Sequence, residues 1–131
     1  MFGDADAAIA RIEEDVRRAQ RRAERYPAFQ AAVDGVRARA VSRRRDVAVE
    51  VDAGGIVRVL EVTDAAAERG GRYVTQEVMA LIGAASRDAR AKTLAITAEI
   101  LGEDDPIVKV VAADLEAQET GSHAWRTGGR A

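Results

Sequence analysis

The fold is decided by the stretch Val47-Ala48-Val49-Glu50-Val51-Asp52, then Ala53-Gly54-Gly55, then Ile56-Val57-Arg58-Val59-Leu60-Glu61-Val62. Both outer segments are rich in β-branched residues and alternate along the chain, which predicts two strands. Residues 53–55 are predicted to join them as a hairpin, because glycine supplies the positive φ that tight turns need. Upstream, the basic segment 37–45 is predicted to hold a short edge strand, since edge strands often carry charge. Together these segments predict a three-stranded antiparallel meander.

Helices are predicted on both sides of the meander. Apolar residues spaced alternately three and four apart from Ile9 to Tyr26 predict a long N-terminal helix with a coiled-coil seam. Pro27 predicts a kink in that helix, because proline removes a hydrogen bond and clashes with the preceding turn. A second long helix is expected from an N-cap at Thr75 to Gly102, and a shorter one from the Asp105-Pro106 cap.

The predicted fold class is therefore α+β: a long N-terminal helix, a three-stranded antiparallel meander, a long second helix and a short C-terminal helix, forming a two-layer dimer. Residues 1–118 are expected to form a single domain. Residues 119–131 are polar and rich in turn-forming types, and they are predicted to be a disordered tail.

Composition narrows the function classes. The chain has 131 residues and a net charge of −2, no cysteine and one histidine, His123. These counts exclude disulfides, cysteine metal sites and thiolate nucleophiles, and no acid–base or metal constellation points to an enzyme or a cofactor. No apolar run is long enough to span a membrane, and no secretory signal is visible, so a cytoplasmic protein is expected.

Charge is distributed unevenly along the chain. Residues 1–45 carry 11 Arg and 7 acidic residues, whereas residues 46–131 carry 9 basic and 15 acidic residues. The chain therefore has a basic first third and an acidic remainder.

The chain resembles the YbaB/EbfC family of bacterial nucleoid-associated proteins, and in particular its actinobacterial members. The residues that carry the resemblance are Met1-Phe2-Gly3, the basic first helix, the hairpin 47–62, Thr63-Asp64, and the helix from Gln76 with Ala84-Ala85 and Asp88-Ala89. The resemblance covers roughly residues 1–100, and the third helix and arginine-rich tail depart from it. It implies a homodimer formed through the sheet and helices, projecting long helices, and association with double-stranded DNA in the nucleoid without catalysis.

Two groups of arginines could supply the DNA contacts. Arginines clustered in this way can neutralise backbone phosphates without reading sequence. On the first helix, acidic residues three or four positions away can pair with some of them. A solvated helix face in an arginine-rich chain is the alternative interpretation, and the acidic second half favours it. The candidate residues are Arg17, Arg18, Arg21, Arg22 and Arg25 on the helix and Arg43, Arg44 and Arg45 at the turn.

The dimer is predicted to form through the sheet, because strands made almost entirely of Val, Ile and Leu are too apolar for a small sheet with one wet face. The first-helix seam is a second surface that needs a partner. The alternative function is a dimeric adaptor that binds another protein, for example in secretion, and lacks DNA affinity. The expected interface residues are Val47, Val49, Val51, Val57 and Val59.

Overall fold

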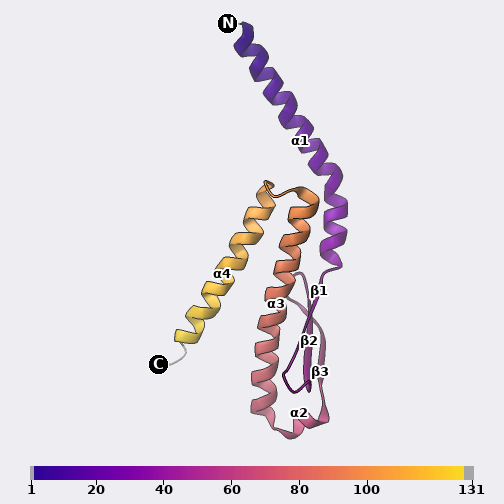
Figure 1. Ribbon diagram of the computed structural model, residues 1–131, viewed down its shortest axis with the longest axis vertical. Helices are drawn as coiled ribbons and strands as arrows, with labels where there is room; N and C mark the ends of the chain where they lie inside the picture. The colour runs from indigo at the N-terminus through magenta and orange to yellow at the C-terminus, as the bar shows by residue number, and fades with distance from the viewer. Residues whose placement is uncertain (1, 129–131) are drawn as a thin grey trace.

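Four helices and three strands make up the fold in the computed structural model, which describes the backbone of residues 2–128 and the side chains of residues 3–117 (Figure 1). They follow the predicted order, which confirms the α+β class. The elements are α1 (Phe2–Asp34), β1 (Arg37–Val41), β2 (Val47–Asp52), β3 (Val57–Val62), α2 (Asp64–Glu68), α3 (Gly71–Leu101) and α4 (Pro106–Gly128).

The three strands pair in the order β1-β2-β3, and both pairings are antiparallel. Glu50 lies opposite Arg39 of β1 and Val59 of β3, which fixes the register. The carboxylate of Asp52 holds the β2–β3 turn by accepting hydrogen bonds from the backbone N–H groups of Gly54 (2.9 Å) and Ile56 (3.0 Å). The meander predicted from residues 37–62 is thus confirmed.

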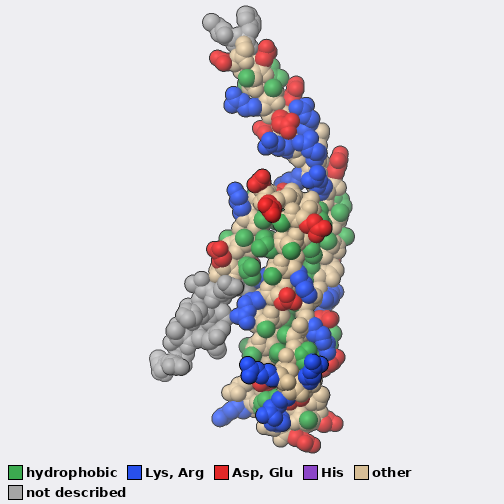
Figure 2. Space-filling model, viewed as in Figure 1, with side chains coloured by type: hydrophobic (Ala, Val, Ile, Leu, Met, Phe, Trp, Pro, Cys, Tyr) green, Lys and Arg blue, Asp and Glu red, His purple; other side chains and the backbone are tan. Residues whose placement is uncertain are grey.

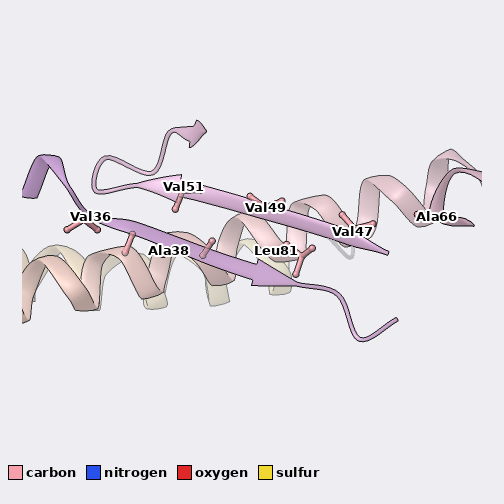
Figure 3. Packing of buried hydrophobic residues seen from close by; sticks show 9 residues of the cluster. Val36, Ala38, Val47, Val49, Val51, Ala66 and Leu81 are labelled. Carbon is pink, nitrogen blue, oxygen red and sulfur yellow. The ribbon is translucent and has the colours of Figure 1, made fainter. Parts of the chain in front are cut away.

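The core lies between the sheet and α3 (Figure 3). Val47, Val49 and Val51 of β2 are at most 1% exposed, and they share the buried cluster with Ala85 and Ala89 of α3. Because alanine is small, α3 can approach the strands closely, and the bulky valines fill the space between them. The valine face of β2 is therefore buried against α3 of the same chain.

The third strand stays uncovered, because α3 packs against β1 and β2. Leu60 and Val62 pair with Val49 and Val47 on the side of the sheet that faces α3. They nevertheless remain 53% and 39% exposed. Strand β3 is thus an apolar edge strand whose side chains are not covered by a helix of the same chain.

Helix α1 runs through Pro27 without a break. Figure 1 shows its axis changing direction part-way along, and its N-terminal part projecting beyond the rest of the molecule. The predicted kink is thus present. Ile9, Ile12 and Val16 of the seam lie on this projecting part and are 54%, 62% and 50% exposed.

Helix α3 begins four residues before the predicted N-cap at Thr75. It starts at Gly71 and follows Gly70, whose φ of 100° suits glycine. Tyr73 and Val74 pack against the core, and their burial favours an extra turn of helix. The predicted end at Gly102 is confirmed by its φ of 95°.

The start of α4 follows the prediction, since Oδ1 of Asp105 accepts a hydrogen bond from the Ile107 N–H at 2.9 Å. The helix continues to Gly128 and so includes residues 119–128, which were expected to be disordered. Residues 129–131 of the expected tail lie outside the described residues.

Candidate nucleic-acid interface

Three arginines of α1 converge on one carboxylate. Arg17, Arg18 and Arg21 lie 3.1, 3.5 and 3.4 Å from the Glu14 oxygens. The hydrogen bond from Arg17 is the main cause that lowers the pKa of Glu14. All three guanidinium side chains remain at least half exposed, so they keep access to solvent while part of their charge is compensated.

Arg22 is held by a partner that the sequence spacing could not reveal. Its Nε and Nη2 donate to the two carboxylate oxygens of Asp105 at 2.6 and 3.2 Å. The Asp105 side chain is only 4% exposed. Burial alone would raise the pKa of Asp105, but hydrogen bonds from Arg22 and from the Ile107 N–H outweigh it and lower the pKa. Arg22 therefore ties α1 to the start of α4.

Arg25 differs from Arg22. It is exposed, and within the described part of the chain it makes no ion pair. It is the one member of the predicted helix group for which the structure shows no carboxylate partner among the residues it describes.

The basic excess of the first third does not reside in α1. Residues 2–26 contain six arginines and six acidic residues, whereas residues 37–45 contain five arginines and no acid. Since surface fields depend on local net charge, β1 and the turn after it are the strongest basic segment of the chain.

Arg43, Arg44 and Arg45 occupy the turn between β1 and β2, and all three are exposed. Ser42 and Asp46, which flank them, are only 5% and 6% exposed. Among the residues with described side chains, no carboxylate forms an ion pair with any of the three arginines. Their positive charges are consequently available to an external anion.

A buried hydrogen-bond network supports this turn. The Ser42 hydroxyl donates to Oδ1 of Asp46 at 2.7 Å, and the Tyr73 hydroxyl reaches Oδ1 and Oδ2 at 3.0 and 2.9 Å. The Ser42 hydrogen bond is the main cause that lowers the pKa of Asp46, burial opposes it, and Tyr73 lowers the pKa further. The turn is therefore fixed to the start of α3.

Two further arginines that the sequence did not single out lie at the same end. Nε of Arg69 is 3.7 Å from Oδ2 of Asp46, and its Cζ lies 5.5 Å from the centre of the Tyr73 ring. Arg72 is exposed in the first turn of α3. A sequence signal existed, because these arginines flank the pair Gly70-Gly71.

The two predicted arginine groups are not brought together within one chain. Figure 2 shows basic side chains along the projecting part of α1 and a separate group at the opposite end, near α2. This separation follows from the direction of β1, which leads away from α1 toward α2. Within one protomer the two groups therefore form separate basic regions.

The predicted dimer residues are also divided by the structure. Val47, Val49 and Val51 are buried in the chain's own core, so in this conformation they cannot contact a second chain. Val57 is 39% exposed and Val59 is half-buried, and both lie on the uncovered strand β3. The expected interface therefore narrows to β3.

Asp105, part of the acidic group 103–105, is occupied by Arg22 and by the α4 cap. Among the residues described, no group of three or more His, Cys, Asp or Glu could hold a metal ion. His123 and Trp125 lie outside the described side chains. No helix in the described part of the chain is long and apolar enough to cross a membrane.

Comparisons with protein-family models, with curated proteins and with solved structures find no match to this chain.

Proposed function

We propose that this protein is a nucleoid-associated DNA-binding protein of low sequence specificity that acts as a homodimer in the cytoplasm, without catalysis. The observation that carries the proposal is the exposed positive charge of Arg43, Arg44 and Arg45, for which no carboxylate partner is found among the described residues. Arginine side chains of this kind bind duplex phosphates, and phosphate contacts carry no direct sequence information. The resemblance to the YbaB/EbfC family and the projecting α1 helix add support.

The uncovered strand β3 supports the dimer. Its apolar side chains Val57 and Leu60 are 39% and 53% exposed, and Ile56, which directly precedes the strand, is 61% exposed. Long, apolar, exposed edges are uncommon in monomeric proteins, because they expose unpaired backbone groups and apolar area together. A second copy of the chain that covers β3 would pair the backbone groups of the edge and bury its apolar side chains.

A gel shift of purified protein with unrelated duplexes at 50 and 200 mM salt tests the function. If a dimer places roughly six arginines on phosphates, the affinity falls about 10³-fold between these salt concentrations. All duplexes of equal length should bind alike. No shift at 50 mM salt and micromolar protein would refute the proposal.

The second candidate function is the protein-binding adaptor. It is favoured by the exposed α1 seam, in which Ile9, Ile12 and Val16 are at least half exposed on the projecting part of the helix. An apolar helical stripe of this spacing can bind an amphipathic partner helix. Failure of the gel shift, combined with a dimer in solution, would favour this function.

A further inference from the structure

The turn between β1 and β2 presents arginines on a rigid support. Its ends are fixed by the buried Ser42 and Asp46, and the Arg45 N–H donates to the Ser42 carbonyl at 2.9 Å. The Ser42 hydroxyl also accepts hydrogen bonds from the backbone N–H groups of Asp46 and Val47. Little backbone entropy is therefore lost when an anion binds the side chains of this turn.

Arg45 occupies a backbone position where arginine is disfavoured. Its φ is +57°, and it is the one non-glycine residue with positive φ in the described part of the chain. Glycine would adopt this conformation without a steric cost, whereas a residue with a Cβ loses roughly 1 kcal/mol. An arginine here supplies charge to the surface at the expense of local backbone energy.

Arg72 extends the surface beyond the turn, and Arg69 supports the turn through its ion pair with Asp46. Arg72 follows Arg69 by three residues and lies in α3. Asp64 and Glu68 of α2 lie between the sheet and α3 in the chain order and reduce the positive field at this end. Neither of these acids forms an ion pair with the arginines in the described residues.

The α1 arginines are less suited to phosphate contact. Arg17, Arg18 and Arg21 share Glu14, and Arg22 is held by the buried Asp105. A phosphate would have to displace these carboxylates, which lowers the net gain from each contact.

We propose that duplex phosphates are contacted mainly at the arginine tip, defined as Arg43, Arg44, Arg45 and Arg72, and that the carboxylate-paired arginines of α1 contribute little. The inference rests on the proposed function and specifies its surface. The guanidinium groups of the tip can each bind one backbone phosphate.

The test compares two triple variants of the full chain that remove equal charge. One is Arg43→Gln, Arg44→Gln and Arg45→Gln, and the other is Arg17→Gln, Arg18→Gln and Arg21→Gln. Binding to one duplex is measured by fluorescence anisotropy from 50 to 200 mM salt. Each lost phosphate contact lowers the slope of log affinity against log salt by about 0.9. Because both chains of the proposed homodimer carry the change, each variant removes six arginines, and we expect a decrease of roughly 4–5 for the tip variant and less than about 2 for the α1 variant.

Single variants keep the test independent of folding. Arg45→Gly relieves the steric cost of the positive φ but makes the unfolded chain more flexible. These effects oppose each other, so the unfolding midpoint should stay nearly unchanged, while the salt slope of the dimer should fall by about 2. Arg72→Gln should lower the slope similarly. Asp64→Asn with Glu68→Gln should strengthen binding, because these substitutions remove opposing charge.

The outcomes separate the two proposals. If wild-type protein does not bind DNA, the proposed function fails and the inference fails with it. If wild-type protein binds and the α1 variant loses as much slope as the tip variant, DNA binding stands and the arginine tip is refuted. Binding to vesicles that contain phosphatidylserine, without binding to DNA, would also refute it.

Discussion

Arg22 and Arg25 lie three residues apart on α1, and both were predicted to contact DNA. The structure separates their roles, because Arg22 donates to the buried Asp105 whereas Arg25 makes no ion pair in the described residues. Removing one partner of a buried charge pair leaves the other charge uncompensated. The two arginines should therefore affect stability differently.

We expect Arg22→Gln to lower the free energy of unfolding by about 1–2 kcal/mol at pH 7, less than for a fully buried pair because Arg22 is 44% exposed. Arg25→Gln, the matched control, should change it by less than about 0.5 kcal/mol. Urea denaturation measures both. Equal losses in the two variants would contradict the assigned role of Arg22.

The effect of Arg22→Gln should depend on pH. The pKa of Asp105 is lowered in the folded chain. Stability from this carboxylate is therefore complete above the unfolded-state pKa of about 3.9 and is lost as the pH falls through the lower folded-state pKa. The difference between wild type and Arg22→Gln should shrink below about pH 4.

At the scale of elements, the two prolines occupy different helical positions. Pro27 lies in the interior of α1, where it removes a backbone hydrogen bond, and Pro106 is the first residue of α4, where its missing N–H costs nothing. The bend of α1 in Figure 1 is the expected consequence of an interior proline.

We expect Pro27→Ala to raise the free energy of unfolding by about 1 kcal/mol, because a hydrogen bond is regained and a clash is removed, partly offset by a more flexible unfolded chain. Pro106→Ala is the control and should not raise it. Urea denaturation measures both free energies of unfolding. Small-angle scattering of the folded protein should give a longer maximum dimension for Pro27→Ala than for the wild type. An unchanged dimension would show that another feature causes the bend.

At the scale of the whole molecule, strand β3 and the projecting part of α1 carry apolar side chains that the described part of the chain does not cover. Leu60 of β3 is 53% exposed, and Ile12 of α1 is 62% exposed. The core of this small domain is made largely of valine and alanine. Its stability should therefore rise substantially if a second copy buries these apolar side chains.

Light scattering at micromolar concentration should give the mass of two chains. Val57→Asp on β3 should shift the mass to one chain, because it places a charge in the interface. Val110→Asp on α4 is the matched control, since Val110 is 68% exposed, and should leave the mass unchanged. A single-chain mass for wild type would refute the dimer. Val49→Asp, at a fully buried position, should unfold the chain.

Local interactions explain what the sequence by itself determined. The alternation of Val47 to Val62, the turn at 53–55, the end of α3 at Gly102 and the cap at Asp105 are all properties of neighbouring residues, so they could be predicted. The N-cap of α3 was predicted at Thr75, five residues after the observed cap at Gly70, because the additional turn depends on packing of Tyr73 against the core.

Contacts between distant residues explain what only the tertiary structure decided. Asp105 reaches Arg22 across 83 residues, a pairing that no helical spacing reveals. Packing of α3 on β1 and β2 buries Val49 and leaves Leu60 exposed, although both strands have the same apolar pattern. The direction of β1 places the Arg43–Arg45 turn at the end opposite to the projecting part of α1. Burial, ion pairing and the position of charge thus depend on how the elements pack, because each requires groups that are remote in sequence to meet in space.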